Sequence, residues 1–119
     1  MIAFATFFAV CSIAPAGAYQ QGEWVLGQWQ GGAYYYPGIV AGQVNGMVTI
    51  RYDDGDVDTR PVNQVRPYDW RVGSRVECNF QRAGVWYSGT ISSLGGASLA
   101  IAYDDGDFET TRTGLCRSR

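Results

Sequence analysis

The residues best suited to chemistry are two acidic runs, Asp53-Asp54-Gly55-Asp56 and Asp104-Asp105-Gly106-Asp107. Neighbouring carboxylates can act as general acid and base or bind a metal ion. An EF-hand calcium loop has its glycine at the sixth position, whereas here the glycine is third. Asp-Gly is also typical of a hairpin turn, in which aspartates accept backbone hydrogen bonds. We prefer the hairpin interpretation and expect no metal ion and no cofactor.

Several function classes are excluded by what the chain lacks. It has no histidine, which is the commonest general base and metal ligand, and no lysine for Schiff-base chemistry. The paired aspartates have no recognisable base-nucleophile partner, so we do not expect an enzyme. The net charge is −2 and the nine arginines are spread along the chain, so nucleic-acid binding is not expected.

The second half of the chain repeats the first. Residues 22–66 align without a gap with residues 73–117, at an offset of 51, and thirteen of the 45 aligned positions are identical. Internal similarity of this extent indicates a duplicated structural unit. We therefore divide the chain into a leader at residues 1–18, a first repeat at residues 19–69 and a second repeat at residues 70–119.

Each repeat is predicted to form five short strands. Sixteen glycines, together with four Trp, eight Tyr and five Phe, favour strands and tight turns over helices. Asn45-Gly46, Asp54-Gly55 and Asp105-Gly106 predict type I′ turns, in which both central residues have positive φ. The predicted strands are Trp24–Gln30, Tyr34–Ala41, Met47–Tyr52, Val57–Pro61 and Gln64–Arg66, then Arg75–Gln81, Val85–Ser92, Leu99–Tyr103, Phe108–Arg112 and Leu115–Arg117.

Short strands that close on themselves remove exposed sheet edges. The sequence therefore predicts an all-β fold of two tandem five-stranded barrels. The linker Pro67-Tyr68-Asp69-Trp70 is short and rich in aromatic residues, so we expect the two barrels to pack on each other.

Residues 1–18 are typical of a secretory signal peptide. Residues 2–13 are mostly apolar, and Ala16-Gly17-Ala18 offers the small residues that a signal peptidase accepts. Twelve residues are too few to span a bilayer as a helix. We predict cleavage before Tyr19, with no membrane span afterwards. A buried N-terminal strand and a fragment of a longer chain are the alternatives.

Cleavage would remove Cys11 and leave Cys78 and Cys116. An even number of cysteines suits an oxidising compartment, so we predict a disulfide between them and a secreted or periplasmic location. Such a bridge would stabilise the fold by about 4 kcal/mol. The alternative to the disulfide is that both cysteines are buried free thiols. If the leader is not a signal peptide, the alternative location is nuclear or intracellular.

The aromatic and acidic motifs resemble those of a Tudor domain. In the first repeat, WQGGAYYYPGIV at residues 29–40 is followed by VTIRYDDGD at residues 48–56. The second repeat has the strand motif W-Y-x-G-x-[IV] within residues 80–91 and the hairpin motif Y-D-D-G-D within residues 100–107. Both motifs are similar to those of Tudor and agenet-type domains, and the likeness covers nearly all of the mature chain.

The resemblance implies an SH3-like barrel with an aromatic cage for methylated lysine or arginine. Carried over by position, the cage residues would be Trp29, Tyr36, Tyr52 and Asp54 in the first repeat and Phe80, Tyr87, Tyr103 and Asp105 in the second. A methylated cation loses its water easily and is attracted to ring faces, at about 0.5–2 kcal/mol per contact. Asp56 and Asp107 stand where many cages have another aromatic residue. The alternative is that these rings are ordinary core and rim packing.

We therefore predict a non-enzymatic binding module that holds a methylated or other cationic group of a partner protein or peptide. A secretory address is at odds with histone tails as ligands. The ligand would then be a quaternary ammonium compound, an Arg- or Lys-rich peptide or an envelope partner. The alternative is a structural or assembly protein of the cell envelope or extracellular space, with a degenerate cage.

Overall fold

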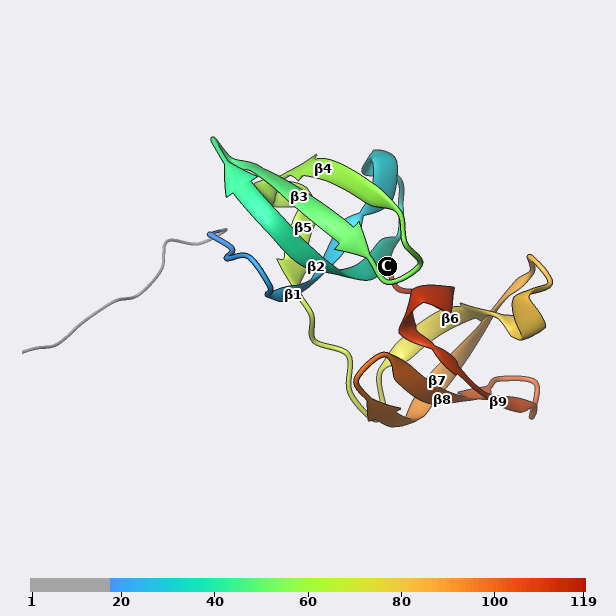
Figure 1. The fold of residues 1–119 in the computed structure, drawn as a ribbon. Helices are drawn as coiled ribbons and strands as arrows, with labels where there is room; N and C mark the ends of the chain where they lie inside the picture. The colour runs from blue at the N-terminus through green and yellow to red at the C-terminus, as the bar shows by residue number, and fades with distance from the viewer. Residues whose placement is uncertain (1–17) are drawn as a thin grey trace, which may run out of the picture.

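The computed structural model describes residues 18–119, so the predicted signal peptide falls outside the described residues except for Ala18. The described chain contains ten strands and four short 3-10 turns in two sets. Figure 1 shows these sets as two small barrels that lie side by side. The predicted all-β fold of two five-stranded SH3-like barrels packed on each other is confirmed. Among the described residues, no helix is both long and apolar enough to cross a membrane.

The two barrels have the same strand order. Barrel 1 consists of β1 (Trp24–Gln28), β2 (Tyr35–Val44), β3 (Met47–Tyr52), β4 (Val57–Pro61) and β5 (Val65–Pro67). Barrel 2 consists of β6 (Arg75–Asn79), β7 (Trp86–Gly95), β8 (Ser98–Tyr103), β9 (Phe108–Arg112) and β10 (Cys116–Arg117). The 3-10 turns are η1 (Trp29–Gly31), η2 (Val62–Gln64), η3 (Phe80–Arg82) and η4 (Thr113–Leu115). The sheet order is β4-β3-β2-β1-β5 in barrel 1 and β9-β8-β7-β6-β10 in barrel 2, with antiparallel pairing throughout.

The glycine of each W-Y-x-G-x-[IV] or related segment lets two strands approach closely. A Cβ on Gly38 would lie 2.7 Å from the Arg51 carbonyl oxygen, and one on Gly89 would lie 2.6 Å from that of Ala102. A few residues later the register shifts between Val40 and Gly42 of β2, as it does at the same place in β7. Such bulges bend a strand, which lets a five-stranded sheet close into a barrel.

The hairpin turns agree only in part with the sequence prediction. Asn45 and Gly46 both have positive φ, at 52° and 78°, as a type I′ turn requires. At Asp54-Gly55 only the glycine has positive φ, so the type I′ prediction is wrong there and at Asp105-Gly106. The reason is a longer loop, in which Asp54 Oδ1 accepts the Asp56 N–H and Asp105 Oδ1 accepts the Asp107 N–H, each at 3.0 Å.

The disulfide predicted between Cys78 and Cys116 is present. The two cysteines are directly paired across β6 and β10. β10 has only two residues and so forms few backbone hydrogen bonds. The disulfide therefore helps to hold β10 against β6. The matching positions in barrel 1 are Gly27 and Val65, which pair without a covalent bond.

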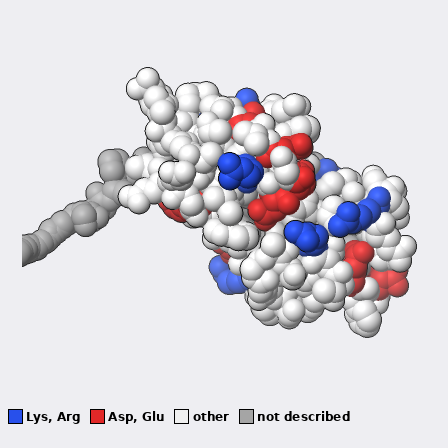
Figure 2. All heavy atoms as spheres, viewed as in Figure 1, with Lys and Arg blue, Asp and Glu red and all other residues white. Residues whose placement is uncertain are grey.

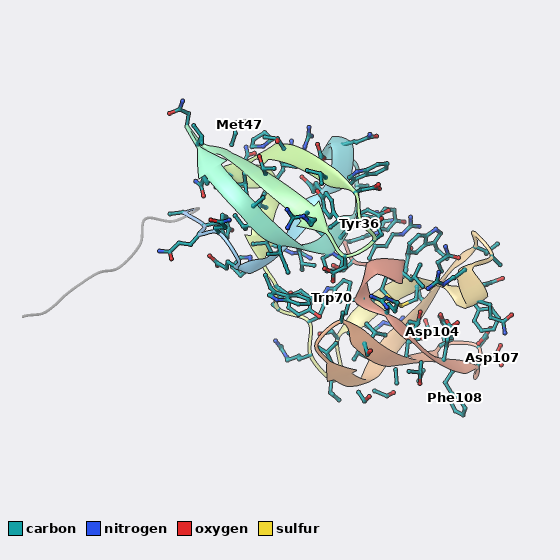
Figure 3. The ribbon with its side chains drawn as sticks, viewed as in Figure 1. Tyr36, Met47, Trp70, Asp104, Asp107 and Phe108 are labelled. Carbon is teal, nitrogen blue, oxygen red and sulfur yellow. A yellow bond between two sulfur atoms is a disulfide. The ribbon has the colours of Figure 1, made fainter. Side chains whose placement is uncertain are left out.

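Apolar and backbone contacts join the two barrels. Trp70, which Figure 3 shows between them, is 6% exposed and shares a core cluster with Leu26 of β1 and with residues of barrel 2. Its indole N–H donates to Ser118 Oγ at 3.2 Å. Ser118 also pairs with Tyr35 through two backbone hydrogen bonds, of 2.7 and 3.0 Å. The end of the chain therefore lies beside β2 of barrel 1 (Figure 1).

A second contact joins η4 to the loop between β3 and β4. The Thr113 hydroxyl donates to Asp53 Oδ2 at 2.5 Å. A Cβ on Gly114 would lie 2.8 Å from the Asp53 carbonyl carbon, so only glycine permits this approach. Burial raises the pKa of Asp53, and the hydrogen bond from Thr113 partly opposes that shift. The acidic loop of barrel 1 is thus held against barrel 2.

Candidate functional site

The 3-10 turn η1 places Trp29 at the surface. The sequence predicted a strand through Gln30, but β1 ends at Gln28 because Gln30 has a φ of 52°. Asp58 on β4 holds this turn, since its Oδ2 accepts the Gln30 N–H at 2.7 Å. Trp29 is 37% exposed. Barrel 2 has the same contact, in which the Gln81 N–H donates to Glu109 Oε2 at 2.9 Å.

Asp58 and Glu109 occupy matching positions of the two repeats, and the sequence analysis gave neither of them a role. Their signal was available in the repeat: an acidic side chain recurs at the same place relative to each 3-10 turn. The structure shows that both carboxylates position the turn that carries the first ring of each aromatic set.

The four residues predicted for the first cage line one cavity. Its volume is about 280 Å³, and its lining residues are Trp29, Tyr36, Tyr52, Asp54 and Asp56 from barrel 1 and Asn79, Trp86, Gly114 and Leu115 from barrel 2. We call this cavity the aromatic pocket. It lies at the junction of the barrels, and Figure 3 shows Tyr36 at that junction. The site is therefore composite, which the repeat alignment alone did not suggest.

Trp86 is the ring that sequence reasoning missed. The alignment places it opposite Tyr35, outside the predicted cage positions. In the folded chain its ring meets that of Tyr36 edge to face, with centroids 6.2 Å apart and planes at 86°. No sequence signal identifies this contact, because it depends on how the two barrels pack.

Arg117 holds these rings in place. Its guanidinium lies 4.1 Å from the Trp86 ring centroid and 3.8 Å from that of Tyr34. It also donates to the Tyr36 hydroxyl at 3.3 Å and forms an ion pair with Glu77 at 3.1 Å. Cation–π contacts of this kind contribute about 0.5–2 kcal/mol each. One arginine of β10 thus links rings from both barrels next to the aromatic pocket.

The polar groups of the aromatic pocket favour a cation. The carboxylates of Asp54 and Asp56 lie on one side of it. Tyr52 is 3% exposed, and burial, with a smaller contribution from Asp58, raises the pKa of its hydroxyl well above the usual value. Tyr52 therefore stays neutral, and its hydroxyl has no hydrogen-bond partner among the described residues. Rings beside two negative charges attract a positively charged, weakly hydrated group.

The predicted rings of the second repeat also come together. Phe80, Tyr87 and Tyr103 have centroids 5.4 to 6.3 Å apart and planes at 81° to 90°, so they form the three faces of a corner. Tyr103 donates to Glu109 Oε1 at 2.7 Å. Burial raises the pKa of Tyr103, as do Glu109 and the nearby charge of Asp105. Tyr87 is 44% exposed, so this corner faces solvent.

No metal centre is found in the part of the chain that the structure describes. Within residues 18–119, no group of three or more His, Cys, Asp or Glu side chains could hold a metal ion. One aspartate of each loop, Asp54 and Asp105, instead accepts a backbone hydrogen bond within its own loop.

Comparisons with known proteins agree with the fold. A family model described as the Tudor domain of the DNA repair protein Crb2 matches residues 22–67. The solved structure of the Crb2 tandem tudor domains has a TM-score of 0.60 and 17% sequence identity, covering 86% of this chain and 81% of that chain. A structure of ADCP1 tandem Agenet domain 3-4 has a TM-score of 0.38 and 14% sequence identity, covering 83% of this chain and 79% of that chain. No curated protein matches.

The family model coincides with barrel 1, and the fold match extends over both barrels. Barrel 2 repeats the motifs of barrel 1 and has the same strand order. The chain thus has a tandem Tudor-like fold, and its first repeat matches a Tudor family model.

Proposed function

We propose that this protein is a non-enzymatic binding module that holds a methylated lysine or arginine of a partner protein in the aromatic pocket. The observation that carries the proposal is that Trp29, Tyr36, Tyr52 and Asp54 all line one cavity. Trp86 of barrel 2 adds a further ring. Tudor-type domains are generally binding modules without catalytic activity, which supports the assignment.

The chemistry of the aromatic pocket favours methylated over unmodified cations. An unmodified ammonium is compact and strongly hydrated, so removing its water opposes its entry. Methyl groups weaken that hydration while keeping the charge, and they contact ring faces well. Asp54 and Asp56 add Coulomb attraction, and either can accept a hydrogen bond from a group that retains a proton.

Peptide titration tests the proposal. Peptides with trimethyl-lysine, dimethyl-lysine, dimethyl-arginine or unmodified residues are added to ¹⁵N-labelled protein, and the indole signals of Trp29 and Trp86 are followed. We expect a methylated peptide to shift both signals and to bind at least about tenfold more tightly than its unmodified counterpart. Unchanged indole signals with every methylated peptide would contradict the proposal.

The repeat supplies a matched control variant. Trp29 is partly exposed and has no ring contact among the described residues, so Trp29→Ala is expected to fold and to lose about tenfold or more in affinity. Phe80→Ala removes the matching ring of barrel 2 and is expected to leave binding in the aromatic pocket unchanged. Equal losses in both variants would place the ligand elsewhere.

We further propose that the protein acts in a secreted or periplasmic location. The disulfide between Cys78 and Cys116 supports an oxidising compartment. Tyr19, the predicted first residue after cleavage, docks on barrel 1, and its hydroxyl donates to the Val65 carbonyl at 3.1 Å. N-terminal sequencing of protein from its native compartment is expected to begin at Tyr19. A chain that still carries its leader there would overturn the proposal.

A further inference from the structure

A second cavity adjoins the aromatic pocket. Its volume is about 260 Å³, and it is lined by Asp53, Asp54, Arg82, Arg112, Gly114 and Leu115. Asp54, Gly114 and Leu115 also line the aromatic pocket, so the two cavities share a wall. A ligand in the aromatic pocket would therefore lie beside this second cavity, which we call the arginine cavity.

The two arginines of this cavity are available to a ligand. Arg82 is exposed at the end of η3, and Arg112 is exposed at the end of β9. The ion pairs within residues 18–119 involve Arg60, Arg75 and Arg117 instead. A guanidinium that is not already paired can receive an anion without breaking an existing contact. Its planar donors suit the two oxygens of a carboxylate or phosphate.

The two acids that line the arginine cavity, Asp53 and Asp54, form no ion pair with Arg82 or Arg112 in the described residues. Asp53 is held by the hydroxyl of Thr113, and Arg112 acts on its carboxyl only through space, lowering its pKa slightly against the effect of burial. Figure 2 shows acidic atoms gathered on barrel 1 near the junction and basic atoms on barrel 2 across from them. The junction therefore presents a negative region and a positive region side by side.

We propose that the arginine cavity is a second subsite, which binds an anionic side chain of the same ligand whose methylated cation occupies the aromatic pocket. The inference rests on the proposed function and adds the anionic group to it. Arg82 and Arg112 would hold the anion, while Asp54 separates it from the cation.

The shared wall of the two cavities limits the spacing of the two groups. Because Asp54, Gly114 and Leu115 line both cavities, a peptide that occupies both must place the two side chains near each other on one face. An extended peptide advances about 3.4 Å per residue, and every second side chain points to the same face. The anionic residue is therefore expected two residues from the methylated one.

Matched peptides test this subsite on the wild-type protein. Each carries trimethyl-lysine, with Glu, phosphoserine, Gln or Arg placed two residues before or after it. A second set carries unmodified lysine. We expect Glu or phosphoserine to improve affinity about three- to tenfold over Gln in one of the two placements, and Arg to weaken it. Glu and phosphoserine together show which source of negative charge is preferred.

Two double variants locate the effect. Arg82→Gln with Arg112→Gln is expected to abolish the preference for Glu over Gln while retaining affinity for the Gln peptide. Arg51→Gln with Arg71→Gln removes the same net charge from exposed residues that line neither cavity, and the preference is expected to persist. Arginine side-chain Nε–H signals of Arg82 and Arg112 are expected to shift only with the anionic peptides.

The outcomes separate this inference from the proposed function. If trimethyl-lysine peptides bind and Glu and Gln are equivalent, the arginine subsite is wrong and the aromatic pocket stands. If anionic peptides bind equally well with and without methylation, the arginine subsite stands and the methyl preference is wrong. A preference that survives in the Arg82/Arg112 variant overturns the subsite, and absence of binding to any peptide overturns both.

Discussion

The two barrels carry the same aromatic positions but arrange them differently. In barrel 1, Trp29, Tyr36 and Tyr52 surround a cavity at the junction, and no ring contact joins these three to one another among the described residues. In barrel 2, the three matching rings lie within 5.4 to 6.3 Å of one another, with Tyr103 buried and Tyr87 exposed. Duplication has therefore preserved the frame while changing the space between the rings.

Two substitutions account for part of this difference. Tyr103 reaches Glu109, whereas the matching Asp58 is one methylene shorter and forms an ion pair with Arg60 at 3.1 Å. A Cβ at Gly27 would lie 2.9 Å from the Tyr52 hydroxyl, and barrel 2 has Cys78 at the matching position. The tyrosine hydroxyl of barrel 2 therefore cannot occupy the corresponding space, and it bonds to Glu109 instead.

The comparison also shows what a neighbouring barrel adds. The aromatic set of barrel 1 faces Trp86 and Leu115 of barrel 2, which supply walls that barrel 1 lacks. The aromatic corner of barrel 2 is open on the side of Tyr87, whose side chain is 44% exposed. Two copies of one motif can thus differ in binding because only the aromatic set of barrel 1 lies at the junction with the other barrel.

The largest effect is expected from removing the disulfide, which only barrel 2 has among the described residues. Replacing both cysteines, as Cys78→Ser with Cys116→Ser, is expected to lower the free energy of unfolding by about 4 kcal/mol, because the bridge closes a loop between residues 38 apart. Barrel 2 is expected to lose structure first, since β10 then has only two paired residues to hold it. Urea unfolding followed separately at Trp29 and Trp86 measures this. Identical midpoints for wild type and variant would contradict it.

The tyrosine hydroxyls provide the next comparison. Tyr103→Phe removes a hydrogen bond to a carboxylate and is expected to lower the free energy of unfolding by about 1.5–3 kcal/mol. Tyr52→Phe removes a buried hydroxyl without a partner and is expected to be nearly neutral or slightly stabilising. Chemical denaturation of both variants measures the difference. Similar losses in the two variants would show that the hydroxyls are equivalent.

Trp86 and Tyr35 occupy matching positions, and they differ in exposure to the aromatic pocket. Trp86→Ala is expected to weaken binding of a methylated peptide about 5- to 30-fold, in keeping with the loss of a cation–π partner. Tyr35→Ala removes a ring that stacks with Arg66, at 3.9 Å, and does not line the pocket. Its effect is expected on stability and not on affinity per folded molecule. Calorimetric titration of both variants distinguishes the two roles.

The smallest effect near neutral pH, which grows only in alkali, is expected from the buried tyrosines that both barrels share. Burial raises the pKa of Tyr68 to about 12 and raises those of Tyr52 and Tyr103 as well. The folded state therefore favours the neutral phenols, and this stabilisation is complete below the unfolded value near 10 and is lost as pH rises through the folded values. Unfolding free energies are expected to be level from pH 7 to 9 and to fall above about pH 10. A decline between pH 7 and 9 would contradict this assignment.

Much of the frame was predictable from local pattern. Alternating residues such as Val48 and Ile50 indicated strands, and both are buried. Asn45-Gly46 indicated a type I′ turn because few other residues adopt positive φ twice in succession. The end of β1 was misplaced because a single positive φ at Gln30 depends on the distant carboxylate of Asp58. Local propensity cannot report a contact between residues that far apart.

The sequence by itself determined the duplication, the all-β class and the approximate strand positions, because these depend on residue types and their spacing along the chain. Only the tertiary structure decided that Trp86 completes the pocket of barrel 1 and that Arg82 and Arg112 lie beside it. Those placements depend on how one barrel packs against the other. That packing is set by many weak contacts around Trp70 and Ser118, which no single motif encodes.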